Sequence, residues 1–178
     1  MITEMVCAGF GGQGILTTGM LLSYCAFDTG KKFTWYPAYG AAMRGGTAHC
    51  TIKISDEAIA NPLPDKFDIL IAMNAPAIDK FESEINPGGY IFVNSSLVGE
   101  RKYRDDLNIV EVDTVALAKQ AGNPKGENIA MIGALIKKTG IMSFEGCDKA
   151  IEKYFTEHGK AKFNEANRAA LKVGYESF

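Results

Sequence analysis

The sequence predicts an α/β fold: a mostly parallel, Rossmann-like sheet flanked by helices, with a helical C-terminal part. Two observations favour it. Short apolar segments alternate with helical patterns as far as Gly122, which is typical of a parallel sheet. Beyond Gly122 only helical patterns follow. With 178 residues, 47% of them hydrophobic, one core suffices, so we expect a single α/β domain over residues 1–178.

The first part of the chain is expected to hold three strands and one helix. Residues 3–8 form a strand that runs into the glycine-rich sequence CAGFGGQGIL. Residues 13–28 are apolar nearly all round, as in a helix buried against a sheet. Residues 32–36 form a strand that Pro37 stops. Residues 47–55 (TAHCTIKIS) alternate between apolar and polar, which indicates a strand with one wet face.

The middle of the chain continues the alternation. Residues 67–73 (FDILIAM) form a compact apolar strand of the kind buried in parallel sheets. Residues 75–85 form a helix that the sequence NPGG ends. Asn74 is favoured as its N-cap, and contact with a ligand at the end of the preceding strand is the alternative role. Residues 90–96 (YIFVNSS) and 108–113 (NIVEVD) are two further strands.

Helices complete the chain. The sequence DTVALAKQAG is expected to form a helix with Asp113 as its N-cap, and Ser143 begins a later helix. After NPKG we expect three successive helices, ENIAMIGALIKKTG, SFEGCDKAIEKYF and KAKFNEANRAALKVGYES, which pack on the same sheet.

Composition and charge exclude several classes of function. The formal net charge is −2 with both signs mixed, which argues against a nucleic-acid-binding surface. The N-terminus lacks the pattern of a signal peptide, and the longest apolar run, ILIAM, is far shorter than the roughly 20 residues that span a bilayer. We therefore expect a cytoplasmic protein that contacts no membrane.

The cysteines indicate no metal or redox site in this chain. Cys7, Cys25, Cys50 and Cys147 form no C-x-x-C pair, so neither a disulfide framework nor an iron–sulfur cluster is expected. His49 and Cys50 are adjacent in a strand and point to opposite faces. We expect no metal site and no catalytic residue; if the protein does redox chemistry, the electron carrier is elsewhere.

The glycine-rich sequence is the first candidate site. Gly9, Gly11 and Gly14 have G-x-G-x-x-G spacing between a strand and a helix, which places backbone N–H groups where an anion binds. A dinucleotide site also needs an acidic residue at the end of the second strand, whereas this strand ends TWYPAYG and Asp28 falls before it. A tight turn without any ligand remains an alternative.

A second glycine-rich segment, YPAYGAAMRGGTAHC, links two of the predicted strands. It is expected at the same carboxyl edge of the sheet, where ligands bind in open α/β folds. Arg44 is flanked by Gly45 and Gly46, which leaves its guanidinium open to a carboxylate or phosphate. An ordinary surface or subunit-contact arginine is the alternative.

Together the two segments identify a family. GFGGQG followed by YGAAMRGGTAHCTIKIS resembles the gamma subunit of 2-oxoacid:ferredoxin oxidoreductases, the enzymes of pyruvate, 2-oxoglutarate or 2-oxoisovalerate. The sequences DILIAMN, NPGGYIFVNSS, GENIAMIGAL and NEANRAALKVGYE fit the same family in order. The family often has Pro-Glu where this chain has Ala41 and Ala42, so no role for that glutamate carries over.

The resemblance implies a subunit that is inactive alone and belongs to anaerobic metabolism. Family complexes convert a 2-oxoacid to an acyl-CoA and reduce ferredoxin, using thiamine diphosphate, iron–sulfur clusters and coenzyme A. No cofactor is expected on this chain alone, and the partners are alpha, beta and delta subunits. The loop type favours 2-oxoglutarate or branched-chain substrates. The alternatives are a free-standing dinucleotide-binding oxidoreductase and a purely structural subunit.

The resemblance also indicates a site that faces the active-site entrance and holds coenzyme A phosphates or a partner carboxylate. The residues expected to bind this coenzyme or another anion are Gly9, Gly11, Gly12, Gln13, Gly14, Tyr39, Gly40, Arg44, Gly45 and Gly46.

Overall fold

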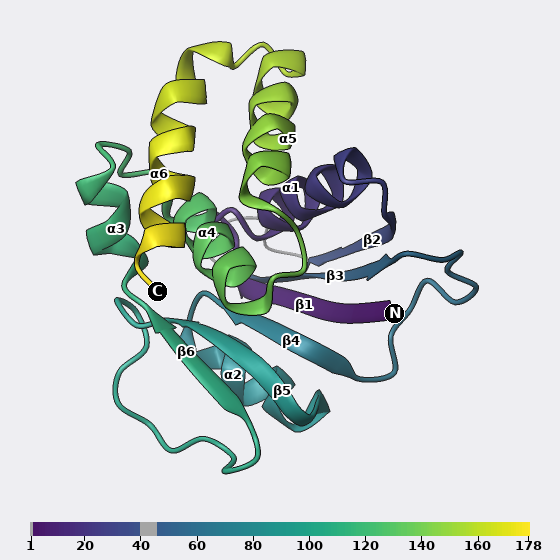
Figure 1. Cartoon of the computed structure of the whole chain (residues 1–178). Helices are drawn as coiled ribbons and strands as arrows, with labels where there is room; N and C mark the ends of the chain where they lie inside the picture. The colour runs from purple at the N-terminus through teal and green to yellow at the C-terminus, as the bar shows by residue number, and fades with distance from the viewer. Residues whose placement is uncertain (1, 40–45) are drawn as a thin grey trace.

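The protein is built around one six-stranded sheet (Figure 1). The computed structural model describes residues 2–39 and 46–178. The strand order is β2-β3-β1-β4-β5-β6; β3 runs antiparallel to both of its neighbours, and the other adjacent pairs are parallel. The expected mostly parallel α/β fold is confirmed. The strands are β1 (Ile2–Phe10), β2 (Lys32–Tyr39), β3 (Thr47–Ser55), β4 (Phe67–Ala72), β5 (Ile85–Asn94) and β6 (Asn108–Val112).

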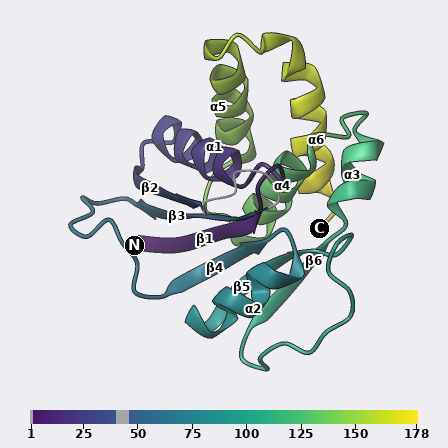
Figure 2. The same ribbon diagram turned by 180° about the vertical axis from the view of Figure 1, so that it is seen from behind.

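Helices cover the two faces of the sheet unequally. Alternate residues of β1 divide between them: Met5 and Cys7 belong to the core under α1 and α4, whereas Val6 and Ala8 belong to the core under α2. Figure 2 shows α2 against its face of the sheet. The described helices are α1 (Ile15–Asp28), α2 (Ala75–Phe81), α3 (Thr114–Gln120), α4 (Glu127–Thr139), α5 (Phe144–Glu157) and α6 (Asn164–Glu176), with 3-10 turns at Glu82–Glu84 and Ala161–Phe163.

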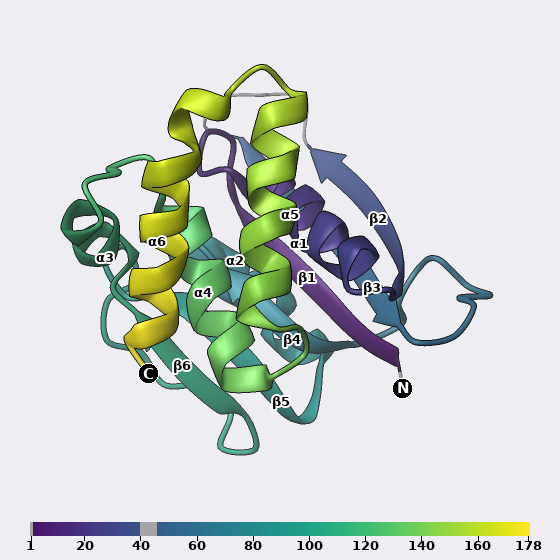
Figure 3. The ribbon, with the colours of Figure 1, turned by 45° about the horizontal axis from the view of Figure 1, so that its top comes forward.

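The C-terminal helices add a further layer, contrary to the expectation that all three pack on the sheet. Of the three, α4 contacts the sheet at β5, whereas α5 packs mainly on α1 and α6 mainly on α4 (Figure 3). Gly133 of α4 and Gly174 of α6 allow this close approach: a side chain at either glycine would meet backbone atoms of the opposite helix. The α5–α6 pair thereby stands over the helices that cover the sheet.

Two expected stop signals lie inside strands. β2 continues through Pro37 to Tyr39, which is tolerated because β2 is an edge strand and pairs only with β3. NPGG lies inside β5, where the pairing with β4 shifts and Gly88 adopts a φ of 78°. The preceding helix ends early, at Phe81, and continues as a 3-10 turn.

The face of β3 that was expected to be exposed to solvent is partly covered. Lys53 is only 5% exposed, and its Nζ lies 2.6 Å from Oε1 of Glu4 on the neighbouring strand. Its charge is therefore paired within the sheet, as burial of a lysine requires.

The expected helix caps are confirmed. The side chains of Asn74, Asp113 and Ser143 each accept a hydrogen bond from a backbone N–H in the first turn of α2, α3 and α5 respectively. All four cysteines are free and buried. Across residues 2–39 and 46–178, no helix has both the length and the apolar character to span a membrane.

Candidate functional site

Both glycine-rich segments meet at one edge of the sheet. The parallel strands β1, β4, β5 and β6 all end there, and the antiparallel β3 begins there. The N–H of Gly11 donates to the carbonyl oxygen of Gly46 at 2.9 Å. The backbone of Tyr39 ends β2 opposite Ala48, at the same edge. The remaining predicted residues of the second segment, Gly40, Arg44 and Gly45, lie outside the described residues.

The glycines of the first loop shape its turn. Gly12 and Gly14 have φ values of 103° and 73°, in the left-handed region that favours glycine. A Cβ at Gly9 would lie 2.6 Å from Oε1 of Gln13 and 2.7 Å from Cδ1 of Ile15. The loop therefore needs glycine for conformation at two positions and for close packing at a third.

The loop leads into an open helix N-terminus. Gly14 is the N-cap of α1, and among the described residues no side chain caps it and no acidic residue stands in the first turn. The first N–H groups of a helix have no partner within the helix and carry partial positive charge. This arrangement is suited to an anionic ligand, as the sequence predicts.

Gln13 holds the loop to the end of β4. Its Oε1 accepts hydrogen bonds from the N–H of Phe10 at 2.6 Å and from Nδ2 of Asn74 at 3.1 Å. Its Nε2 donates to the carbonyl oxygen of Met73 at 3.1 Å. Asn74 also caps α2, so one small network joins the glycine loop, β4 and α2. Gln13 thus positions the loop through its side chain.

A cavity of about 700 Å³ opens beside the loop. It lies between the N-termini of α1 and α4, the turn before α4 and the ends of α5 and α6 that face the loop. Its lining residues are Gly12, Gln13, Gly14, Thr17, Leu97, Asn123, Pro124, Lys125, Glu127, Asn128, Ile129, Phe155, Lys160, Phe163 and Asn167.

Most of this lining was not among the residues expected from sequence. Apart from Thr17 and Leu97, the walls come from segments over 100 residues beyond the glycine loop, which meet it only when α4, α5 and α6 are in place. One local signal was available: the sequence NPKGEN places Gly126 as the N-cap of α4, which marks a second helix N-terminus.

Asp28 gives the dinucleotide alternative no support. It ends α1, at the opposite end of that helix from the glycine loop, and its carboxylate pairs with Lys153 at 3.1 Å. A helix of 14 residues is about 21 Å long, so the two ends are far apart.

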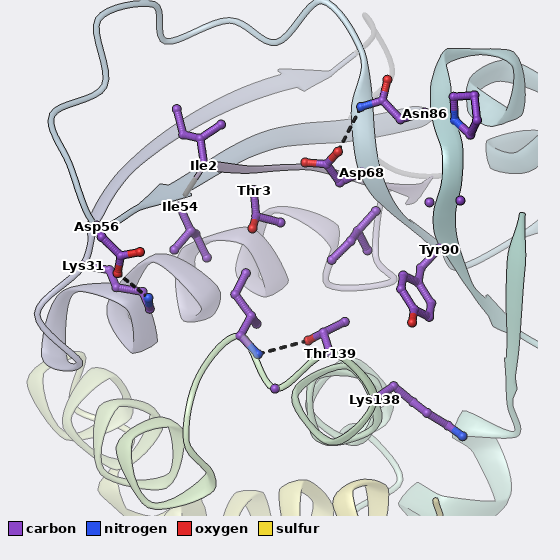
Figure 4. Close-up of a pocket in the computed structure, with 16 residues that line it drawn as sticks. Ile2, Thr3, Lys31, Ile54, Asp56, Asp68, Asn86, Tyr90, Lys138 and Thr139 are labelled. Carbon is purple, nitrogen blue, oxygen red and sulfur yellow. Dashed lines mark hydrogen bonds and ion pairs between the residues drawn. The ribbon is translucent and has the colours of Figure 1, made fainter.

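A second cavity, of about 560 Å³, lies at the opposite edge of the sheet (Figure 4). Its charged groups have contacts within the protein, including Lys138, whose Nζ lies 4.7 Å from the ring centroid of Phe178. Lys31 pairs with Asp56 at 2.7 Å, and the carboxylate of Asp68 accepts from the N–H of Glu4 and from Asn86, each at 2.9 Å. We therefore place the candidate site at the glycine-loop edge.

His49 lies on the α2 face of that edge. Its ring is half-buried and tilted against Phe81, with ring centroids 5.1 Å apart. Burial lowers the pKa of His49 by disfavouring its charged form, and the positive charge of Lys80 lowers it further.

We predict that His49 titrates below pH 6.5 in an NMR titration, and that Lys80→Met moves the pKa back towards that value. Because the folded protein then binds this proton less tightly than the unfolded chain, the contribution of His49 to stability is complete above pH 6.5. It is lost as the pH falls from 6.5 towards the folded-state pKa. A folded-state pKa at or above 6.5 would contradict the burial of this ring.

Comparison with known proteins finds similarity to a family of oxidoreductases and to subunits of 2-oxoacid oxidoreductases. The family model described as pyruvate ferredoxin/flavodoxin oxidoreductase matches residues 4–177. Ketoisovalerate oxidoreductase subunit VorA of Methanothermobacter marburgensis is 36% identical over 94% of this chain, which spans only 34% of that relative's length. 2-Oxoglutarate synthase subunit KorC of Methanocaldococcus jannaschii is 34% identical, over 99% of this chain and 94% of its own length.

A solved structure shows the same similarity. The gamma subunit of a keto/oxoacid ferredoxin oxidoreductase from Geobacter sulfurreducens superposes with a TM-score of 0.82 at 29% identity, covering 98% of this chain and 96% of that one. Because the superposition covers nearly all of this chain, it includes both the sheet and the C-terminal helices.

Proposed function

This chain belongs to the pyruvate ferredoxin/flavodoxin oxidoreductase family, and we propose that it is the gamma subunit of a multi-subunit 2-oxoacid:ferredoxin oxidoreductase. In the proposed reaction the 2-oxoacid loses carbon dioxide, its acyl group joins the thiol sulfur of coenzyme A, and two electrons pass to ferredoxin. Thiamine diphosphate and iron–sulfur clusters, held by other subunits, supply the decarboxylation and electron-transfer chemistry. Alpha, beta and delta subunits are the proposed partners. The proposed location is the cytoplasm, and the proposed role is in anaerobic metabolism.

The proposed substrate is 2-oxoglutarate or a branched-chain 2-oxoacid. The names of VorA and KorC, a ketoisovalerate and a 2-oxoglutarate enzyme, support this choice. The test is to purify the chain with its native partners, identify these by mass spectrometry, and assay ferredoxin reduction with each 2-oxoacid. Recovery without thiamine- or cluster-bearing partners would contradict the proposal.

The proposed role of this subunit is to present donors to coenzyme A phosphates, or to a partner carboxylate, at the active-site entrance. The observation that carries it is the Gly11–Gly46 hydrogen bond, which joins the two glycine-rich segments beside the open N-terminus of α1. Gly11, Gly12 and Gly14 contribute backbone, Gln13 fixes the loop, and Arg44 is proposed as the guanidinium partner because it stands two residues before Gly46 in sequence.

Arg44→Ala in the assembled complex is expected to raise the apparent KM for coenzyme A about tenfold, the equivalent of one charge-assisted hydrogen bond. Steady-state kinetics at saturating 2-oxoacid measures it. Arg168→Ala is the matched control, because Arg168 is exposed on α6 and pairs with Asp148. An unchanged KM with intact assembly would exclude Arg44 from coenzyme binding.

A further inference from the structure

We propose that β2 is a docking strand for a second copy of this chain, which pairs with it antiparallel about a two-fold axis at Thr34. This inference goes beyond the proposed function and does not depend on it. Three properties of the strand carry it: free backbone groups along its outer side, a register in which two copies pair all of these groups, and exposed aromatic side chains that the same register covers.

The outer side of β2 is open because this strand forms one edge of the sheet (Figure 3). Which of its backbone groups face outwards follows from β1. The N–H of Glu4 donates to the carboxylate of Asp68 on β4 at 2.9 Å, and the carbonyl oxygen of Ala8 accepts from the N–H of Met73 at 2.9 Å. Even-numbered residues of β1 therefore point their backbone groups towards β4, and odd-numbered residues point them towards β3.

The continuous pairing of β1, β3 and β2 carries this alternation to the edge. Cys7 lies opposite Cys50, and Cys50 lies opposite Pro37. Because Cys50 directs its backbone groups towards β1, its pair with Pro37 has no hydrogen bonds, and the proline nitrogen faces outwards. Phe33 and Trp35 follow the same alternation, so their N–H and C=O groups also face outwards. Neither N–H has a partner within the described part of the chain.

Two copies of this edge satisfy each other in one antiparallel register. With Thr34 of one copy opposite Thr34 of the other, Phe33 of each copy lies opposite Trp35 of the other. Each copy then donates from both residues and accepts at both residues, which gives four backbone hydrogen bonds in all. A shift by two residues in either direction leaves at least one of these free groups unpaired. The edge is therefore self-complementary, and exposed groups of this kind are a template for pairing with another chain.

The pairing ends at the next hydrogen-bonding position, where Lys31 of one copy would lie opposite Pro37 of the other. The N–H of Lys31 already donates to the carbonyl oxygen of Ala26 at 2.9 Å, and proline has no N–H. Neither residue therefore has a free donor to extend the pairing.

The same register brings complementary side chains together. On the α1 face, Phe33, which is 38% exposed, lies beside Trp35 of the other copy. On the opposite face, Tyr36, which is 55% exposed, lies opposite Lys32 of the other copy, where the ammonium group contacts the face of the ring. Pairing therefore covers two large side chains that are otherwise open to water.

Analytical ultracentrifugation of the full-length chain under reducing conditions tests the dimer. We expect a reversible dimer with a dissociation constant on the order of 10 µM, because one strand from each copy makes a small contact. A single monomeric species at concentrations up to about 1 mM would overturn the proposal.

Cysteine cross-linking tests the register. Thr34→Cys places two thiols opposite each other in a pair without hydrogen bonds, where Cα atoms are about 4.5 Å apart, a distance that a disulfide spans. Mild oxidation is expected to give a covalent dimer on a non-reducing gel, to which the four buried native cysteines do not contribute. Lys32→Cys is the control, because residue 32 of one copy faces residue 36 of the other. Equal cross-linking of the two variants, or none in Thr34→Cys, would overturn the proposed register.

Two substitutions of Phe33 separate the backbone from the side chain. Phe33→Ala and Phe33→Pro both remove the ring, but only proline removes the outward N–H, and neither disturbs the pairing with β3. We expect alanine to raise the dissociation constant about threefold and proline at least about tenfold more, since each dimer loses two hydrogen bonds. Val115→Asp, at an exposed position on α3, is the control and leaves the dimer unchanged.

Equal dissociation constants for the alanine and proline variants would mean that the backbone of β2 does not pair. If Phe33→Pro does not fold, the cross-linking of Thr34→Cys still decides. In the co-purified complex, a cross-linked product of twice the mass of this chain supports the proposal, and a product that contains another subunit overturns it. An inactive complex would contradict the proposed function alone, because the dimer is measured on the chain itself.

Discussion

Gly174→Ala is expected to lower the free energy of unfolding by about 2–4 kcal/mol, although alanine is the better helix former by about 1 kcal/mol. The added Cβ would overlap the carbonyl oxygen of Ala130 and lie 2.7 Å from its carbonyl carbon. These are backbone atoms of α4, which cannot turn aside as a flexible side chain would. Helices α4 and α6 must therefore separate or shift.

Urea unfolding followed by circular dichroism measures this effect as a lower midpoint. Gly99→Ala is the control, because a Cβ there has nothing within 4 Å and should change stability by less than about 0.5 kcal/mol. Equal midpoints for the wild type and Gly174→Ala would mean that α6 does not approach α4 as described.

Local signals in the sequence predicted most of the fold. The strands of the parallel part are short apolar runs, and the caps Asn74, Asp113 and Ser143 have the side chain that accepts a first-turn N–H. The prediction that Pro37 ends its strand was wrong, because the free-energy cost of a proline in a strand depends on whether that strand lies at the edge of the sheet. This position is a property of the assembled sheet. The layering of α5 and α6 depends on the close contact of Gly133 and Gly174, two glycines 41 residues apart.

The candidate site likewise has one part that the local sequence predicts and one part that it does not. The glycine loop is contiguous in sequence, so its turn and the helix N-terminus that follows are local and predictable. The cavity wall is not local: Asn123, Lys160 and Asn167 meet the loop only through the packing of α6 on α4. No spacing rule connects such residues, so only the three-dimensional structure brings them together.

The side chain of Gln13 is where the local loop depends on distant residues, and Gln13→Leu tests that dependence. Leucine is similar in size but would leave the N–H of Phe10, Nδ2 of Asn74 and the carbonyl oxygen of Met73 without their present partner. Each such group that stays unpaired costs about 1–3 kcal/mol when it is shielded from water. Because Gln13 itself is only partly buried, water will replace some of these bonds, and we expect a total loss of about 2–3 kcal/mol.

The loss of stability in Gln13→Leu should be larger in the glycine loop than in the rest of the protein. This difference separates a role of Gln13 in positioning the loop from a general effect on stability. Hydrogen exchange of the amides in residues 9–14 is expected to accelerate more than that of the central strands. Gln120→Leu, at the exposed end of α3, is the control and should change neither stability nor exchange in the loop. If Gln13→Leu left loop exchange unchanged, the glycines alone would set the loop conformation. If exchange rises and the apparent affinity for coenzyme A falls with it, the network from Gln13 through Asn74 holds the backbone donors in place for their anion.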